Sequence, residues 1–392
     1  MNAYLLSIII PTKDRYQYLK ECLKTIVDIN SDQVEIIVQD NTKINSEIIK
    51  YIEALDWEHI KYFYTSEPLT QTENSEKAVM NSTGEYVCYI GDDDSVSEII
   101  VDIVQLLKKY NIDSCNVNMA GYYWPDVKFS KNRRTPLSFD TRRVNVKKID
   151  TKKVFKKYLK SGMQEMLLLP RLYHGIISRK VLDEIKNISG SYFPGPSPDM
   201  ANASVAALVL DWHLMIKLPI IISGTAHNSA AGKGISGTHK GKLSGVSQIA
   251  SDTEEKWDHR IPKLWLGNTI WPESCLKALE QAKAIEYSNL LNFYPIYARI
   301  CIKHREYIPL VKEHLSKPID YLMTIYEGTK DIVRWSIKKL FKVAREKLNF
   351  EYICKDDISL TEACLITNKH NRAIDNIEII SKQIEKKVNL KG

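Results

Sequence analysis

The sequence lacks the cysteine spacing of a disulfide framework or a zinc site. Its seven cysteines stand singly, with no CxxC pair, at positions 22, 88, 115, 275, 301, 354 and 364. An odd number of scattered cysteines is untypical of secreted disulfide scaffolds, and zinc sites need closely spaced ligands. We therefore expect free thiols and a reducing compartment, the cytoplasm.

Long hydrophobic runs are also missing. The apolar run Leu5–Ile10 stops at Pro11, with no basic segment before it and no cleavage site after it. A secretory signal needs both features, and a bilayer span needs about 20 consecutive apolar residues. The run is therefore predicted to be a first β-strand, and any membrane contact is predicted to be peripheral.

Glycine is absent from the segment that follows this strand, Ile10-Pro11-Thr12-Lys13-Asp14-Arg15. Dinucleotide oxidoreductases carry GxGxxG at this place, because the backbone must approach a pyrophosphate closely. A sugar-phosphate nucleotidyltransferase would also want a glycine-rich phosphate loop there. The absence argues against both enzyme classes.

The chain does contain enough apolar sequence for a large core. Of its 392 residues, 44% are hydrophobic and 26% are charged, as in average globular proteins. This length suits one large α/β domain with a smaller appendage. The net charge of +7 is uneven, with seven Lys or Arg residues from Lys330 to Lys347 against two acids. Such a balance suits anionic partners, for example a nucleotide-sugar or a phospholipid surface.

From Leu5 to about Asn118, short β-branched runs alternate with helical patterns, as in the βαβ units of a largely parallel sheet. The expected strands are Leu5–Ile10, Val34–Gln39, Ile60–Tyr64, Tyr86–Ile90 and Ser114–Asn118, and the expected helices are Tyr16–Asp28, Glu47–Leu55, Glu73–Asn81 and Ser97–Tyr110. Ligands of open α/β sheets bind beyond the carboxyl ends of the strands. The residues that follow each strand are therefore the candidates for a site.

Regularity weakens after Ala120, and Ala120–Asp150 is predicted to be loop and edge structure. The next expected elements are a helix at Thr151–Ser161, a strand at Arg171–Ile177, a helix at Arg179–Lys186, a helix at Met200–Leu210 after a proline-rich turn, and a strand at Leu218–Ser223. Gly224–Ser247 is rich in Gly, Ser and Lys, which predicts a mobile loop and a domain boundary. From Thr253 onward the pattern predicts helices.

The strongest local motif is Tyr86-Val87-Cys88-Tyr89-Ile90-Gly91-Asp92-Asp93-Asp94, a buried-type strand that runs into three carboxylates. Carboxylate oxygens bind Mg²⁺ or Mn²⁺, and three adjacent like charges are unfavourable unless a cation neutralises them. An Asp-rich turn that caps the next helix is the alternative.

Two further strand ends carry polar residues. Asp40 ends the second strand, where an acid can accept hydrogen bonds from a ribose or a base edge; a plain turn is the alternative. After the first strand, the backbone and Thr12 are placed to meet a nucleotide, and Asp14 is a candidate cap for the following helix.

Together the segments IIIPTKDR, VEIIVQDN and GEYVCYIGDDDS resemble the nucleotide-binding half of family 2 glycosyltransferases, an inverting group with the GT-A fold. The match is good over about the first 120 residues and weak to about residue 225. It implies that Pro11 and Asp40 lie at the nucleoside, with Thr12, Asp14 and Arg15 nearby. It also implies that Asp92, Asp93 and Asp94 serve the donor's diphosphate through Mg²⁺ or Mn²⁺. Many members have Asp where this chain has Gly91, so which of the three carboxylates holds the ion stays open.

An inverting transferase needs a general base to deprotonate the acceptor hydroxyl. The family places a carboxylate at a helix start for this purpose, which implies Asp199 in Ser197-Pro198-Asp199-Met200. The usual Glu-Asp pair is absent, and an ordinary helix cap is the alternative. His174 is a candidate for the acceptor pocket and His227 for the metal or diphosphate site. Lys233 and Lys240 could neutralise diphosphate, although solvated loop positions explain all of these side chains as well.

The C-terminal region contains one helical stripe of apolar residues, at Val333, Ile337, Leu340, Phe341, Ala344 and Leu348, with a basic surface beside it. Such a helix can lie on an anionic membrane. The alternative is a core helix with a solvated basic face. Trp257, Trp265 and Trp271 could contact an acceptor or simply pack between helices.

The sequence thus predicts a GT-A domain at residues 1–240, with a nucleotide-sugar half at 1–120 and an acceptor half at 121–240, followed by a helical domain at 241–392. The expected function is inverting transfer of a sugar from a nucleotide-sugar to a glycan or lipid-linked glycan, as in capsule or O-antigen synthesis. The sequence is compatible with peripheral contact with the inner face of the cytoplasmic membrane and with homo-oligomers. No nucleic-acid partner is expected. The alternative is a non-catalytic, nucleotide-binding scaffold subunit.

Overall fold

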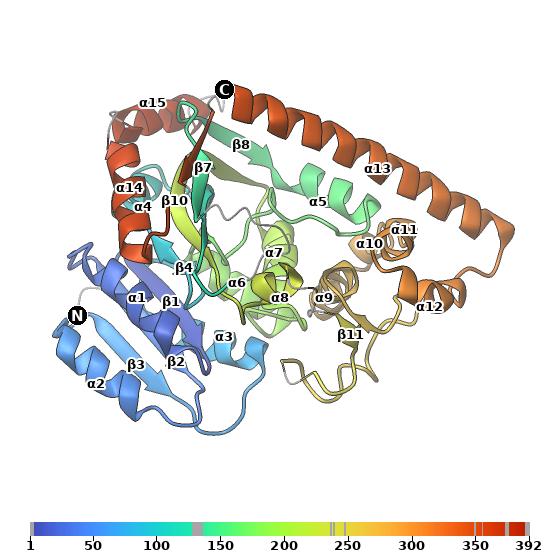
Figure 1. Cartoon of the computed structure of the whole chain (residues 1–392), viewed down its shortest axis with the longest axis horizontal. Helices are drawn as coiled ribbons and strands as arrows, with labels where there is room; N and C mark the ends of the chain where they lie inside the picture. Colours follow the sequence, from blue (N-terminus) through green and yellow to red (C-terminus); the bar gives the residue numbers. More distant parts are fainter. Residues whose placement is uncertain are drawn as a thin grey trace.

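The computed structural model of the chain describes residues 4–127, 136–235, 237, 240–246, 248–348, 350–354, 356–372 and 376–388, with the backbone alone at 342–347. A broad sheet with helices on both faces occupies one side of the molecule. A group of helices occupies the other side and includes the long helix α13 (Pro318–Lys347), which runs along the edge of the molecule (Figure 1).

The main sheet has 11 strands within the described residues. They are β1 (Leu6–Thr12), β2 (Val34–Asp40), β3 (Ile60–Tyr64), β4 (Tyr86–Tyr89), β5 (Ser95–Val96), β6 (Ser114–Tyr123), β7 (Leu137–Asp140), β8 (Val146–Asp150), β9 (Gly175–Ser178), β10 (Trp212–Thr225) and β13 (Glu351–Cys354). The order is β13-β7-β6-β9-β4-β1-β2-β3, and β10 joins β5, β6 and β8 to this path. A separate short pair is formed by β11 (Gly241–Lys242) and β12 (Leu264–Trp265).

The predicted parallel sheet is confirmed over its first four strands. β1 pairs in parallel with β2 and with β4, and β2 pairs in parallel with β3. Beyond β4 the sheet is mixed, because β9 is antiparallel to both β4 and β6 while β6 and β10 are parallel. The carboxyl ends of β1, β2 and β4 therefore meet at one edge, as a ligand site in an open α/β sheet requires.

Helices cover both faces of this sheet. In the first part of the chain they are α1 (Tyr16–Val27), α2 (Ser46–Leu55), α3 (Gln71–Met80), α4 (Ile100–Lys109), α5 (Thr151–Lys160), α6 (Arg179–Ser189), α7 (Pro198–Val209) and α8 (Ala230–Ile235). Alternate residues of a strand point to opposite faces. Accordingly, Ile8 and Ile10 join a core with α1 and α4, while Ile9 joins a second core with α3, α6 and α7.

Ala120–Asp150, predicted to be loop and edge structure, contains strand in three of its described parts. β6 continues to Tyr123, and β7 and β8 form two further strands. β7 alternates buried and half-buried residues over only four positions, and β8 pairs antiparallel with β10. Strands this short are stabilised by their partners rather than by their own sequence, so periodicity alone does not reveal them.

The chain after residue 240 is largely helical, as predicted, and its last elements return to the sheet. Its helices are α9 (Gly267–Gln281), α10 (Ile285–Ser288), α11 (Tyr294–Lys303), η1 (Arg305–Tyr307), α12 (Ile308–Lys312), α13, α14 (Leu360–Arg372) and α15 (Asn376–Val388). β13 pairs with β7, α14 packs on α1 and β10, and Ile380 and Ile384 of α15 belong to the core of the first part. The division at residue 240 stays a prediction, and β13, α14 and α15 pack on the first part.

The apolar stripe of α13 faces solvent, so the core-helix alternative is wrong. Val333, Ile337, Leu340, Phe341 and Leu348 are each between 47% and 71% exposed. None of the helices in the described part of the chain is long and apolar enough to cross a membrane.

Candidate functional site at the carboxyl ends of the strands

The acidic cluster after β4 is paired with an arginine from the loop after β1. Arg15 Nε lies 3.1 Å from Asp92 Oδ1, and Arg15 Nη2 lies 2.9 Å from Asp93 Oδ2. The Thr12 hydroxyl donates to Asp92 Oδ2 at 2.7 Å. The neighbouring positions of β1 and β4 in the sheet bring these side chains together, so the structure joins four of the predicted site residues in one cluster.

Burial makes this cluster electrostatically strained. Asp92 and Asp93 are only 3% and 5% exposed. Burial raises the pKa of Asp92 to about 6 against the opposing charge of Arg15. Burial, followed by the negative charge of Asp94, raises the pKa of Asp93 to about 7. Even beside Arg15 the two carboxylates therefore titrate near neutral pH, and a further nearby cation would favour their charged forms.

Asp94 has a different environment from its two neighbours. Its Oδ2 accepts hydrogen bonds from the backbone N–H of Gly91 at 2.7 Å and from Tyr173 Oη at 3.3 Å, and it lies 2.7 Å from His174 Nε2. Its Oδ1 accepts from the backbone N–H of Gly224 at 2.7 Å. A carboxylate offers about four acceptor positions, so Asp94 is occupied in holding the turn after β4 to β9 and β10.

The end of β10 closes over the same cluster. The backbone N–H of Ala226 donates to Asp93 Oδ2 at 3.0 Å, and Trp124 Nε1 donates to the carbonyl of Asp93 at 2.9 Å. A Cβ added to Gly224 would stand 1.6 Å from that carbonyl, so the strand can approach this closely only with glycine. His227 follows Ala226 directly; its side chain is exposed, and its backbone N–H donates to Asp126.

Asp40 lies at the end of β2, opposite Thr12 of β1 in the sheet register. It is fully buried, and its carboxylate accepts from Tyr16 Oη at 2.6 Å, from Tyr62 Oη at 2.8 Å and from the backbone N–H of Thr42 at 2.8 Å. About one acceptor position is left for a nucleoside. The nucleoside role of Asp40 stays a prediction.

Pro11 and Asp14 flank the start of this region. Pro11 is half-buried in β1, and Asp14 is exposed with a left-handed backbone (φ 57°). The expectation that Asp14 caps the following helix is wrong, because Arg15 occupies the N-cap position of α1 without a side-chain cap. The backbone N–H of Asp14 instead donates to Thr42 Oγ1 at 2.8 Å.

Asp199 lies in the first turn of α7, at the helix start that the sequence indicates. Its carboxylate is half-buried and accepts from the Ser197 hydroxyl and from the backbone N–H of Met200. Burial is the main reason that the pKa of Tyr173 is raised well above its ordinary value, and the charges of Asp94, Asp93 and Asp199 add to it. Tyr173 itself contacts the acidic cluster through Asp94 Oδ2, 3.3 Å from its hydroxyl.

Tyr173 and Arg171 are site residues that the sequence did not single out. Tyr173 stacks on His174 with ring centroids 3.9 Å apart, and Arg171 Nε donates to the Tyr173 carbonyl at 3.0 Å. Arg171 is buried, and its Nη1 has no hydrogen-bond partner in the described structure. Only their position beside His174 could have indicated them. His174 itself is 5% exposed, so its role at the acceptor stays a prediction.

The other basic and aromatic candidates come from the part of the chain after β10. Lys240 Nζ is 2.8 Å from Glu306 of η1, and Lys233 lies in α8. Trp257 is buried and donates to the carbonyl of Ile261. Trp265 and Trp271 pack against the core of the helical region. Packing between helices is the alternative to an acceptor contact for these tryptophans.

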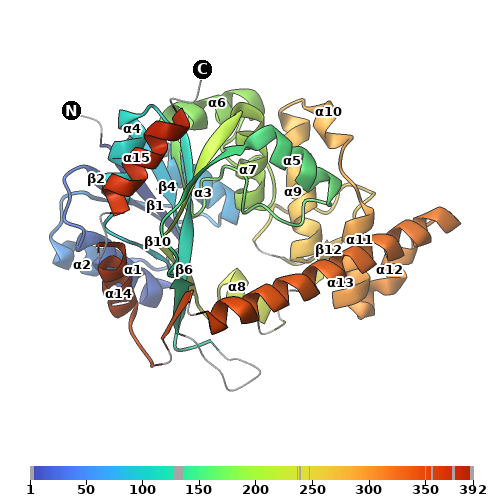
Figure 2. The same ribbon diagram turned by 90° about the horizontal axis from the view of Figure 1, so that it is seen from above.

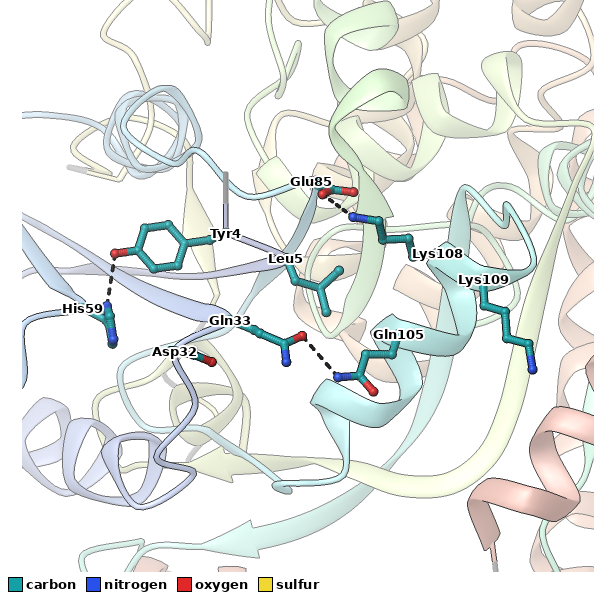
Figure 3. Close-up of a pocket in the computed structure, with 9 residues that line it drawn as sticks. All are labelled: Tyr4, Leu5, Asp32, Gln33, His59, Glu85, Gln105, Lys108 and Lys109. Carbon is teal, nitrogen blue, oxygen red and sulfur yellow. Dashed lines mark hydrogen bonds and ion pairs between the residues drawn. The ribbon is translucent and has the colours of Figure 1, made fainter. Parts of the chain in front are cut away.

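A cavity beside the sheet lies at the opposite end of the strands. It measures about 670 Å³ and is lined by the residues just before β1, β2, β3 and β4, namely Leu5, Gln33, His59 and Glu85, together with α4 (Figure 3). Its polar side chains pair with one another, as Tyr4 does with His59 and Lys108 with Glu85. Because ligands of open α/β sheets bind at carboxyl ends, this cavity is not the candidate donor site.

The oxygens of Asp92 and Asp93 are of the type that binds a divalent ion, although the described side chains do not converge on one point as the ligands of an ion do. Among the described residues, no three His, Cys, Asp or Glu side chains converge as a metal site. Asp92 and Asp93 offer the hard oxygens that Mg²⁺ and Mn²⁺ prefer. Both now face Arg15, whose guanidinium would have to withdraw, and the oxygens of Asp94 are already engaged.

One family model matches the N-terminal part of the chain. Residues 7–167 match the family described as glycosyl transferase family 2. No curated protein matches the chain.

Solved structures show only distant likeness. TarS 1–349 of S. aureus in complex with UDP-GlcNAc is 15% identical, with a TM-score of 0.43 over 82% of this chain and 89% of that chain. The longer S. aureus TarS is 16% identical, with a TM-score of 0.39, and the match covers 56% of this chain but 36% of that chain. The mannosyltransferase PcManGT from Pyrobaculum calidifontis, in complex with GDP-Man and Mn²⁺, is 12% identical, with a TM-score of 0.38 over 84% and 88%.

Proposed function

Because the chain carries the domain of the family 2 glycosyltransferases over residues 7–167, we propose that it transfers a sugar from a nucleoside-diphosphate donor to an acceptor hydroxyl, with inversion at the anomeric carbon. One observation supports this most. Arg15, Asp92 and Asp93 form a buried charged cluster at the carboxyl ends of the strands, where a nucleotide ligand of an open α/β sheet binds.

The donor would bind along the ends of β1, β2 and β4. The segment from Pro11 to Arg15, together with Asp40, would contact the nucleoside, and Arg15 would turn from the carboxylates to the diphosphate. Arginine suits this task because its planar guanidinium can form two parallel hydrogen bonds to phosphate oxygens.

Asp92 and Asp93 would hold Mg²⁺ or Mn²⁺ together with the donor's diphosphate. When bound, the ion supplies positive charge that stabilises the leaving diphosphate. Asp94 would act by positioning the turn that carries the other two carboxylates, since its own oxygens hold the backbone of Gly91 and Gly224. His227 stays a candidate for this site because it directly follows the Asp93 contact at Ala226.

Asp199 would act as the general base. The acceptor oxygen attacks the anomeric carbon, its proton passes to the Asp199 carboxylate, and the bond from that carbon to the diphosphate oxygen breaks, releasing the nucleoside diphosphate. Ser197 and the Met200 backbone hold one carboxylate oxygen of Asp199, which fixes the orientation of the base.

The acceptor would be a glycan or a lipid-linked glycan, with His174 close to it through Tyr173. We place the reaction in the cytoplasm, at the inner face of the membrane, in the synthesis of a surface polysaccharide such as capsule or O-antigen. All seven cysteines are free thiols, which is compatible with that compartment. In this proposal residues 1–240 carry both halves of the catalytic domain, and residues 241–392 form the helical region.

The base can be tested by comparing Asp199→Asn with Asp150→Asn. Asp150 is the matched control because it caps α5 through Lys153 and belongs to no predicted site. Loss of a general base lowers turnover by about 10²- to 10⁴-fold. We expect this loss in transfer or donor hydrolysis for Asp199→Asn only, with donor binding retained. Undiminished turnover in Asp199→Asn would remove Asp199 from the mechanism.

The donor site can be tested by calorimetric titration of UDP and GDP with and without Mn²⁺. A catalytic donor site predicts nucleotide binding that is tighter with Mn²⁺ and weakened by Asp93→Asn. Binding that Mn²⁺ leaves unchanged would contradict the metal assignment. Combined with absent turnover, it would favour a nucleotide-binding scaffold subunit.

A further inference from the structure

Helix α13 presents a face that nothing in the described part of the molecule covers. Leu322 is 62% exposed, Val333 53%, Ile337 47%, Leu340 71% and Phe341 67%. Single exposed apolar residues are ordinary, but a continuous row of large ones marks an interaction surface. The helix runs along the outside of the helical region in both views (Figures 1 and 2).

The opposite side of α13 fixes it to the body of the protein. Thr324, Glu327 and Asp331 are buried on that side, where α13 packs on α11. Arg299 of α11 pairs with Asp331 at 2.5 Å, and Lys303 lies over the ring of Trp335. At about 100° per residue, the apolar row lies on the far side of the helix from these contacts, so it is available to a partner.

The spacing of the row is compatible with a flat partner and with a helical one. Ile319, Tyr326, Val333 and Leu340 are seven residues apart, the repeat that a left-handed coiled-coil partner requires, so spacing alone does not select the partner. Tyr326, Ile337 and Leu348 follow one another at intervals of 11 residues, as do Leu322 and Val333. Eleven residues make about three turns at 3.67 residues per turn, close to the 3.6 of a straight helix. The row is therefore nearly straight along a 30-residue helix, which spans about 45 Å.

Basic residues outnumber acids along this part of α13, with seven Lys or Arg against two acids from Lys330 to Lys347. Tyr326, Val333 and Ile337 line an apolar groove together with Lys330, Arg334 and Lys338. These three cations pair with Glu327, Asp331 and Glu165, so the excess positive charge comes from the remaining basic residues. Glu327 and Asp331 are 8% and 5% exposed and turn toward the body. A second copy of the chain would bring positive charge against positive charge, whereas an anionic surface would be complementary.

We propose that α13 binds the surface of an anionic lipid bilayer, with its apolar row among the upper acyl chains and its basic residues at the lipid phosphates. An exposed amphipathic helix with a cationic flank binds membranes through buried apolar area together with attraction to anionic headgroups. This binding needs neither donor nor turnover. It is therefore tested independently of the proposed transfer reaction.

The test is co-sedimentation of the full chain with vesicles of phosphatidylcholine alone and with vesicles in which about a third of the lipid is phosphatidylglycerol. The variant Val333→Gln/Ile337→Gln/Leu340→Gln removes the row with a helix-compatible residue. Ile285→Gln is the matched control, because Ile285 of α10 is 68% exposed and lies outside α13. The variant Lys338→Gln/Lys339→Gln isolates the charge.

We expect the wild type and Ile285→Gln to bind the anionic vesicles, and the triple variant to bind about 10- to 100-fold more weakly. Binding of the wild type should fall with added salt, and less so in Lys338→Gln/Lys339→Gln. Circular dichroism and donor hydrolysis verify that the variants are folded.

Three results would overturn the proposal. They are no sedimentation of the wild type with anionic vesicles, equal binding to phosphatidylcholine alone, or a dimer in sedimentation velocity that the triple variant abolishes. The last result would assign the row to contacts between copies of the chain.

Discussion

Replacing Arg15 by Met tests whether a protein side chain, in the absence of ligand, neutralises the acidic cluster. Arg15 lies 3.1 Å from Asp92 and 2.9 Å from Asp93, and the side chains of these two acids are only 5% and 7% exposed. Methionine keeps much of the length of arginine and removes its charge. The substitution therefore leaves two buried carboxylates without their counter-charge.

The expected cost follows from the burial of the pair. Removing one partner of a buried ion pair destabilises a protein by about 3–5 kcal/mol, because the remaining charge is uncompensated. That cost applies only while the acids are charged. Burial raises the pKa of Asp92 to about 6 and, with help from Asp94, that of Asp93 to about 7. The stabilisation by Arg15 is therefore present above about pH 7 and is lost as the pH falls through 7 and 6.

The measurement is urea denaturation of the wild type and Arg15→Met at about pH 8 and about pH 5. We expect a loss of about 3–5 kcal/mol at the higher pH and little loss at the lower pH. Arg142→Met is the control, since Arg142 pairs with Asp140 on the surface and exposed pairs contribute about 0–1 kcal/mol. A cost below about 1 kcal/mol at pH 8, or the same cost at both pH values, would refute the neutralising role of Arg15.

Two further substitutions test the surroundings of the site and the core of the helical region. Gly224→Ala should lower the denaturation midpoint and the activity together, because its Cβ would stand 1.6 Å from the Asp93 carbonyl. Gly234→Ala is the control, since its Cβ would meet open space and should change neither quantity. An unchanged midpoint in Gly224→Ala would contradict the close approach of Gly224 to Asp93. Burial raises the pKa of Glu273 in the folded state to about 7. The unfolded state therefore releases the Glu273 proton at a lower pH than the folded state does. For this reason the free energy of unfolding of the wild type should fall between about pH 5 and pH 8. Glu273→Gln should remove part of this fall in pH-dependent urea melts, and an identical pH profile would contradict the assignment.

The first half of the fold could be predicted because its strands have their own sequence signal. β1 and β2 are buried on both faces, so most of their residues are apolar and many are β-branched. β7 and β8 have no such signal, because the four residues of β7 and the lysines of β8 become strand only through pairing with distant partners. The return of α15 to the first core likewise depends on contacts that local periodicity does not encode.

The site shows the same division between local and long-range information. The sequence placed Asp92, Asp93 and Asp94 together at a strand end and required a cation for them, but it could not identify the cation as Arg15 or assign the three acids different tasks. Those tasks depend on residues far along the chain, since Asp94 bonds to Gly224 and lies beside His174, which adopts a left-handed backbone (φ 58°). Because the carboxylate of Asp94 accepts hydrogen bonds from the backbone on both of its oxygens, we propose Asp92 and Asp93 rather than Asp94 for the ion. This proposal depends on hydrogen bonds to Gly91 and Gly224, which the spacing of the motif does not encode.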